Sequence, residues 1–281
     1  MKDNKLTAEQ IEAYGRRLGE EERARGTIEK YLRDVRQFAA WLDGRPVTKE
    51  MASGWKEYLM GNGYAPATIN SMLSSVNTLF RFLGRNECRL KFLKIQQRLF
   101  REQSKELNRE EYNRLLTAAR ALGRERLALL MEAICASGIR VSEVPYLTVE
   151  AAGGGSAQIS LKGKIRTILL PGKLCRKLIK YARKNKIATG EIFLTSNGKR
   201  LSRKQIWAEM KRLCVLADVE ASKVFPHNLR HLFARAFYKA GRDVAKLADV
   251  LGHSSIETTR IYLLSTGAEH QKQLDRLDLV S

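Results

Sequence analysis

The chain has 281 residues, and 44% of them are hydrophobic, which suits packed cores and excludes a disordered chain. Lysine and arginine number 51 against 30 for aspartate and glutamate, so the net charge of +21 favours a nucleic-acid partner over a solubility bias or ribosome association. No run of about 18 apolar residues occurs and the polar N-terminus does not resemble a signal peptide, so we expect a cytoplasmic protein without a transmembrane helix.

Residues 7–84 are predicted to form four helices. Thr7 to Gln10 has the capping-box pattern, and apolar residues follow at helical spacing. Thr27 and Thr48 are expected to open the second and third helices, and the fourth follows Pro66. We therefore predict a helical N-terminal domain over residues 1–94 that could fold alone.

Residues 95–107 are the candidate interdomain linker. Basic residues crowd this segment and the position before it, namely Lys94, Arg98, Arg101 and Lys105. Such a segment could lie along a DNA backbone, or it could be a solvated tether; the charge alone does not decide between them.

The rest of the chain, residues 108–281, is predicted to be a mixed α+β domain. Asn108 with Glu111 predicts one capped helix, and Ser202 with Gln205 caps another that runs to about 217. Further helices are expected over 124–137, 226–240, 243–251 and 256–264. The stretches 158–161 and 165–170 flank Gly163-Lys164 and predict a hairpin, with 192–194 as a candidate third strand. The fold class is therefore mainly α with a small antiparallel sheet. The four widely spaced cysteines are expected to be reduced packing residues.

Three of the four histidines fall within residues 227–253, close to several other residues that could act on a phosphodiester. Arginine presents a rigid fork that matches phosphate oxygens, so Arg140 and Arg230 could clamp the non-bridging oxygens and stabilise the transition state. The phenol of Tyr262 needs a base or cationic surroundings to become a nucleophile, because its ordinary pKa is about 10.

Proton transfer would come from the remaining members of the set. His227 could act as acid or base, and His253 could donate to a phosphate oxygen. A lysine on the hairpin, Lys162 or Lys164, could protonate the leaving 5′-oxygen. The arginines would supply the counter-charge, so we expect neither a metal nor another cofactor.

Each residue also has an ordinary structural explanation. Arg140 could be an ion-pair partner of Glu143, and Tyr262 could be a packing residue. His227 and His231 are four residues apart, as metal ligands on a helix can be, but the glutamate of an HExxH motif is absent. The functional hypothesis therefore depends on the whole set.

The sequence resembles the tyrosine recombinase (phage integrase) family, in a two-domain form similar to Xer-like and transposon members. The resemblance is carried by Ser137-Gly138-Ile139-Arg140-Val141-Ser142-Glu143, by His227-Asn228-Leu229-Arg230-His231-Leu232-Phe233-Ala234, and by Leu251-Gly252-His253-Ser254-Ser255-Ile256 with Thr258, Thr259 and Tyr262. Asn228 stands where the family frequently has an aspartate.

The resemblance implies a role for each position. Arg140 and Arg230 would be the phosphate clamp, His227 the acid/base, His253 the second phosphate ligand and Tyr262 the nucleophile. Glu143 would be a supporting residue, and the family pattern favours Lys162 as the catalytic lysine, with Lys164 still a candidate. The first domain would be a core-binding (SAM-like) DNA-binding domain.

The resemblance also implies a mechanism and partners. Tyr262 would form a 3′-phosphotyrosine, and two rounds of strand exchange would pass through a Holliday junction without ATP. The partner would be double-stranded DNA with inverted-repeat core sites, bound by a homotetramer or by a heterotetramer with a paralogue, in association with the nucleoid. No membrane and no small-molecule substrate is implied. The tail, residues 264–281, would dock on a neighbouring protomer or would simply be a frayed terminus.

Three alternatives compete with a recombinase. A non-catalytic DNA-binding protein would form no covalent adduct with DNA, and a type IB topoisomerase would relax supercoils without joining two sites. A metal-dependent nuclease is disfavoured, because no acidic cluster with metal-ligand spacing lies near the histidines.

Overall fold

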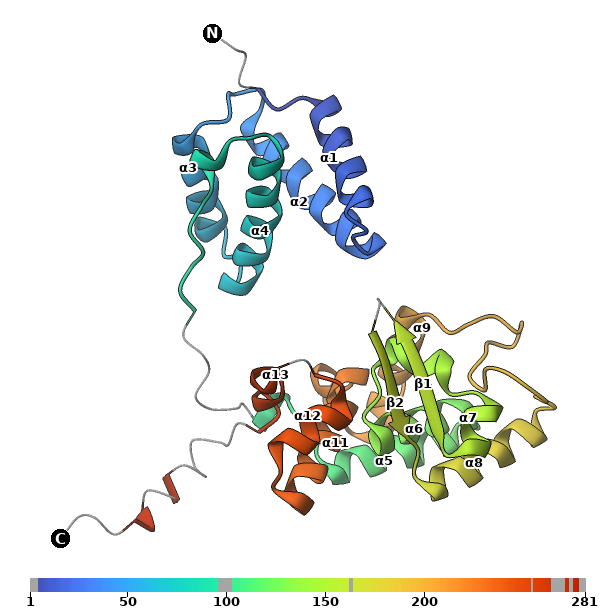
Figure 1. The fold of residues 1–281 in the computed structure, drawn as a ribbon. Coiled ribbons are helices and arrows are strands. Elements are labelled where there is room, and N and C mark those ends of the chain that lie inside the picture. Colours follow the sequence, from blue (N-terminus) through green and yellow to red (C-terminus); the bar gives the residue numbers. More distant parts are fainter. Residues whose placement is uncertain are drawn as a thin grey trace. The chain divides into compact units, whose positions relative to one another are not determined.

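The protein is described by a computed structural model, which covers residues 5–95, 103–161, 164–253, 255–263, 271–272 and 275–277. The chain divides into two compact units, residues 1–97 and 98–281 (Figure 1). The described residues are mainly helical with a small antiparallel sheet, which confirms the predicted fold class. In that part of the chain, no helix is both long and apolar enough to cross a membrane.

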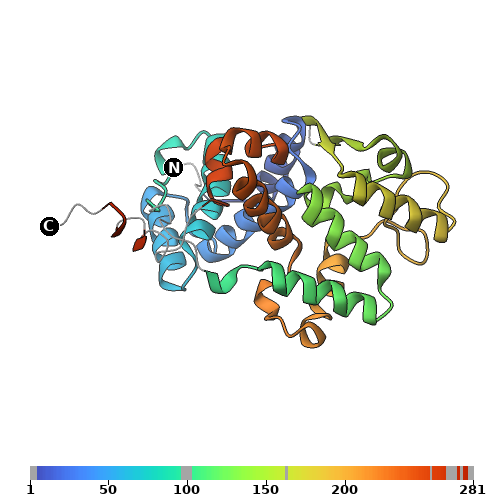
Figure 2. The ribbon, with the colours of Figure 1, turned by 90° about the horizontal axis from the view of Figure 1, so that it is seen from below.

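The first unit is a bundle of four helices, which lie together in both views (Figures 1 and 2). The helices are α1 (Ala8–Glu20), α2 (Arg25–Leu42), α3 (Lys49–Gly61) and α4 (Pro66–Phe82), followed by the short 3-10 helix η1 (Asn86–Cys88). Thr7 and Thr48 cap α1 and α3 as predicted, because each hydroxyl accepts a hydrogen bond from the backbone N–H three residues later in the chain. The expected start at Thr27 was wrong, since α2 begins at Arg25 without a side-chain cap.

Aromatic packing holds the first unit together. The ring of Phe38 meets Trp55 and Phe80 edge to face, with centroid distances of 5.0 and 5.8 Å, and all three side chains are fully buried. Apolar residues from α2, α3 and α4 surround these rings. This unit therefore has a core of its own.

The second unit contains the remaining helices and both strands. Its helices are α5 (Arg109–Ala121), α6 (Glu125–Ser137), α7 (Val149–Gly154), α8 (Gly172–Lys184), α9 (Arg203–Lys211), α10 (Cys214–Ala217), α11 (Pro226–Gly241), α12 (Val244–Leu251) and α13 (Ile256–Arg260). Three 3-10 helices complete it: η2 (Gln103–Lys105), η3 (Val141–Tyr146) and η4 (Ala221–Lys223). The capping boxes at Asn108 and Ser202 are confirmed.

The hairpin is also confirmed, but the third strand is not. Strands β1 (Ser156–Leu161) and β2 (Lys164–Leu169) pair antiparallel, with Ser156 opposite Leu169. The expected strand at 192–194 is wrong: Glu191 pairs with Thr148 and Leu194 with Arg200 only as isolated bridges, and the sheet of the described residues has two strands.

The boundaries of several helices differ from the expectation. The helix predicted over 202–217 is two helices, α9 and α10, and the one predicted over 256–264 ends at Arg260. Helix α8 was not predicted, although Leu174, Leu178 and Ala182 form a buried stripe at helical spacing. The end of the segment expected as linker belongs to the second unit, because Leu107 is buried in its core.

Candidate active site

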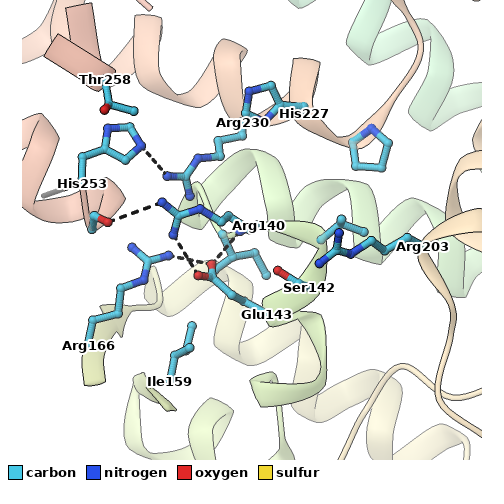
Figure 3. A pocket seen from close by; sticks show the side chains of 14 residues that line it. Arg140, Ser142, Glu143, Ile159, Arg166, Arg203, His227, Arg230, His253 and Thr258 are labelled. Atoms are coloured by element: carbon cyan, nitrogen blue, oxygen red, sulfur yellow. Dashed lines mark hydrogen bonds and ion pairs between the residues drawn. The ribbon is translucent and has the colours of Figure 1, made fainter. Parts of the chain in front are cut away.

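A pocket of about 540 Å³ lies in the second unit, where η3, β2, α11 and the turn after α12 come together. The charged side chains and imidazoles of the wall include Arg140, Glu143, Arg166, His227, Arg230 and His253, most of which converge in Figure 3. Four of the residues predicted as catalytic therefore share one cavity with the predicted helper, although their segments are far apart in the sequence.

Arg140 lies directly after a tight turn. Gly138 ends α6 in the left-handed conformation, at φ +66°, and Arg140 then caps η3. The Arg140 guanidinium donates to Glu143 Oε1 at 3.0 Å and to the carbonyl of Gly252 at 3.4 Å. The ion-pair alternative for Arg140 is thus correct, and the same side chain still lines the pocket.

Glu143 is a buried carboxylate with two cationic partners. Its side chain is only 4% exposed, and Oε2 accepts from the backbone N–H of Arg140 at 2.7 Å and from Arg166 at 2.6 Å. Burial alone would raise the Glu143 pKa, but the hydrogen bonds from Arg140 and Arg166 outweigh it and lower the pKa below its ordinary value. Glu143 therefore stays ionised and holds two guanidiniums in place.

Arg230 is the most deeply buried charge of the site. Its residue exposure is 1%, and its guanidinium donates to the carbonyls of Gly138 and Leu251 and to Nε2 of His253 at 3.0 Å. Desolvation, followed by the charge of Arg140, lowers the Arg230 pKa to about 10, and a hydrogen bond with Tyr262 acts in the opposite direction. Arg230 is still cationic at neutral pH and lies close to both Arg140 and Tyr262.

The tautomer of His253 follows from its contacts. A guanidinium can only donate, so Nε2 accepts from Arg230, and the proton of the neutral ring lies on Nδ1, 2.8 Å from Thr259 Oγ1. Desolvation and then the nearby arginines lower the His253 pKa to about 4. In this structure the imidazole is therefore neutral and does not have an Nε2 proton to donate.

His227 and His231 stand on the first turns of α11. Their rings meet edge to face at 4.8 Å, and His227 lines the pocket with an exposed side chain. The His227 pKa is lowered by desolvation and then by the charges of Arg230 and Arg140. The His231 pKa is lowered to about 3, first by desolvation and then by His227 and Arg235.

Among the described residues no group of three or more histidine, cysteine, aspartate or glutamate side chains could hold a metal ion.

Tyr262 lies in the turn after α13 rather than on the helix that was predicted. It is 6% exposed and packs against Ala234, Leu247 and Leu251, and it is not on the pocket wall. Its ring is nevertheless beside those of His227, His231 and His253, with centroid distances of 6.0, 4.4 and 5.7 Å. Tyr262 is thus adjacent to three imidazoles and shielded from solvent.

The two candidate lysines are not placed by the structure. Lys162 lies outside the described residues, and Lys164 is described only as the first residue of β2. The choice between them remains a prediction. Much of the tail, 264–281, also lies outside the described residues.

Sequence reasoning did not single out Arg166 and Arg203. Arg166 enters the pocket from β2, where it shares the inward face with the buried Ile168. An arginine at an inward strand position is a usable signal, because buried charges are almost always paired. Arg203 reaches the opposite side of the pocket from the start of α9 (Figure 3), and its neighbouring sequence carries no comparable signal.

Comparison with known proteins matches both units. Residues 105–269 match the phage integrase family, and residues 11–87 match the N-terminal SAM-like domain of phage integrases. Tyrosine recombinase XerA of Pyrococcus furiosus is 29% identical over 100% of this chain and 98% of its own length. Tyrosine recombinase XerC of Roseiflexus castenholzii is 30% identical over 90% of this chain and 88% of its own length.

Solved structures show a similar fold. A lambda integrase tetramer bound to a Holliday junction matches with a TM-score of 0.75 at 18% identity, over 92% of this chain and 78% of that one. XerH recombinase bound to its difH substrate matches with a TM-score of 0.67 at 19% identity, over 97% of this chain and 90% of that one. These likenesses concern the fold alone.

Proposed function

The chain belongs to the phage integrase family and is a tyrosine site-specific recombinase, and from this premise we propose that it cuts and rejoins double-stranded DNA through Tyr262. The observation that carries the assignment is the meeting of Arg140, Arg230 and His253 in one pocket, with the ring of Tyr262 beside it.

The proposed cleavage step is a nucleophilic displacement at phosphorus. The Tyr262 oxygen forms a bond to the phosphorus, its proton passes to a base such as His227, and the bond to the 5′-oxygen breaks. The products are a 3′-phosphotyrosine and a 5′-hydroxyl, whose proton comes from Lys162 or Lys164. Arg140 and Arg230 offset the negative charge that develops on the non-bridging oxygens.

The phosphate is also proposed to change the protonation of His253. An anion beside the imidazole favours its charged form, and a phosphate oxygen would compete with His253 Nε2 for the Arg230 donor. DNA binding would therefore add the Nε2 proton that the free protein lacks, so that His253 becomes a phosphate ligand.

Strand exchange follows from the reverse reaction. The 5′-hydroxyl of a partner strand attacks the phosphotyrosine and releases Tyr262, and two such rounds pass through a Holliday junction. We propose a tetramer, of this chain alone or with a paralogue, on two DNA segments with inverted-repeat core sites. The lambda integrase tetramer on a Holliday junction, with its similar fold, supports this arrangement.

The substitution Tyr262→Phe tests the nucleophile. On a suicide substrate with a nick near the cleavage site, the wild-type protein should form a covalent protein–DNA band. The variant should form none while it binds the duplex as tightly as the wild type, because only the attacking oxygen is removed.

A matched control is Tyr238→Phe, since Tyr238 lies on the same apolar cluster but contacts Arg242 rather than the pocket. This variant should retain the covalent band. A normal band with Tyr262→Phe would mean that another residue attacks. Relaxation of a supercoiled two-site plasmid without recombination would favour a type IB topoisomerase.

A further inference from the structure

Arg166 joins three separate segments at the edge of the pocket. From β2, its guanidinium donates to Glu143 Oε2 at 2.6 Å and to the carbonyl of Val250, at the end of α12, at 3.2 Å. In Figure 3 it lies below Arg140, with its guanidinium directed at Glu143. The side chain is 16% exposed, so its contacts are largely shielded from water.

The turn before His253 is shaped to admit this arginine. Gly252 has a φ of +63°, and a Cβ at this position would lie 2.5 Å from both Cδ and Nη1 of Arg166. Any other residue would therefore clash with Arg166 as well as strain the backbone. Since the Gly252 carbonyl also accepts from Arg140, the same turn contacts both arginines.

The charged groups of Arg140, Glu143 and Arg166 differ in their exposure to solvent. Glu143 uses Oε1 for the Arg140 guanidinium and Oε2 for Arg166, and it is nearly buried, whereas the Arg140 side chain is 39% exposed to the pocket. The three groups together carry one net positive charge, and Arg140 is the most exposed of them. Without Arg166, the whole carboxylate charge would be balanced by Arg140 alone, and buried charges interact strongly.

We propose that Arg166 is a positioning residue for phosphate binding: it balances the charge of Glu143 and so keeps the Arg140 guanidinium available to the scissile phosphate. The inference rests on the proposed function, because it gives Arg166 its effect through Arg140. Its own hydrogen bonds are to Glu143 and to the Val250 carbonyl, so it would act through Arg140.

The first test is the rate of covalent adduct formation by Arg166→Gln on the suicide substrate. The rate should fall about 10–100-fold, by analogy with the loss of a residue that orients a metal ligand, at unchanged affinity for the duplex. Arg166→Lys keeps the charge and should recover most of the rate. A lysine variant as slow as the glutamine variant would overturn the charge-balance role.

The second test separates charge balance from a structural tether. In a Glu143→Gln background no carboxylate competes for Arg140, so adding Arg166→Gln should cause no further loss of rate. The double variant should also be faster than Arg166→Gln alone. A tether would instead make the double variant the slowest of the set. This comparison remains informative if Arg166→Gln by itself does not fold, because the double variant has no unpaired buried carboxylate.

Arg126 provides the matched control. Like Arg166, it bridges a carboxylate, Glu209, and a backbone carbonyl, that of Leu194, but it lies outside the pocket. Arg126→Gln should lower thermal stability without slowing adduct formation in folded protein. If the wild-type protein forms no adduct, the proposed function fails. If it does and Arg166→Gln matches it, only the role of Arg166 is wrong.

Discussion

The three imidazoles around Tyr262 are neutral at physiological pH for the same physical reason. His227, His231 and His253 all have lowered pKa values, first because protein atoms replace water around them and then because cationic or imidazole neighbours repel a further proton. In the proposed mechanism, the positive charge that would bind the phosphate also keeps these histidines unprotonated until the anion binds.

This protonation pattern predicts how stability depends on pH. The unfolded histidines titrate near their ordinary pKa of 6.5, whereas His253 and His231 titrate near 4 and 3 in the folded protein. Between pH 7 and 5 the unfolded chain thus binds more protons, and the folded state should lose on the order of 1 kcal/mol for each of these half-buried histidines. Denaturant unfolding of the DNA-free protein at pH 7, 6 and 5 measures this loss.

The buried carboxylate of Glu143 does not obscure the measurement. The pKa of Glu143 is lowered from 4.5, so its stabilising contribution is lost only at more acidic pH. His231→Asn should reduce the pH dependence between 7 and 5. A free energy of unfolding that stays flat over this window in the wild type would contradict the assigned protonation states.

Among the elements, the junction between α6 and η3 has the tightest geometry of the site. Gly138 has positive φ, and a Cβ there would lie 2.4 Å from the ring of Phe233 on α11. The carbonyl of Gly138 also accepts a hydrogen bond from Arg230. The close approach of α6 and α11 is therefore what brings Arg140 and Arg230 together.

We expect Gly138→Ala to be strongly destabilising. Gly123 is the matched control, because it has the same φ of +66°, and no atom of the described residues lies within 4 Å of the position that an alanine methyl would take there. Both alanines incur the cost of left-handed backbone, while only Gly138→Ala also clashes with a ring and should lose about 1–3 kcal/mol more. Thermal or urea unfolding of the two variants checks the difference. Equal losses would show that Phe233 moves aside freely.

Sequence patterns were sufficient to place the starts of several helices. Local capping chemistry correctly located the starts of α1, α3, α5 and α9, because a side chain and a backbone N–H three residues apart decide it. The pattern failed at 192–194, where a short apolar run suits either a strand or a buried loop, and pairing with distant residues decides between them.

For the whole molecule, the dominant property is the net charge of +21. A protein that neutralises several phosphates releases condensed counterions, so its affinity for duplex DNA should fall by about 10³-fold or more between 50 and 200 mM salt. Titration of one fluorescent duplex at several salt concentrations measures the slope. Affinity that hardly changes with salt would contradict a binding mode dominated by backbone phosphates. A duplex without core sites, as the comparison, should show a similar slope at lower affinity.

The sequence by itself determined the helical fold class, most caps and the identity of the motif residues, because these depend on spacings of a few positions and on residue chemistry. Only the tertiary structure decided how those residues interact. Arg140 meets the Gly252 carbonyl across 112 positions, and Arg166 meets Glu143 across 23. Contacts between such distant parts of the chain also decide three further features. These are the neutral tautomer of His253, the burial of Tyr262 beside the pocket and the pairing of Glu143 with two arginines. They depend on atoms within a few ångströms, which no local pattern specifies.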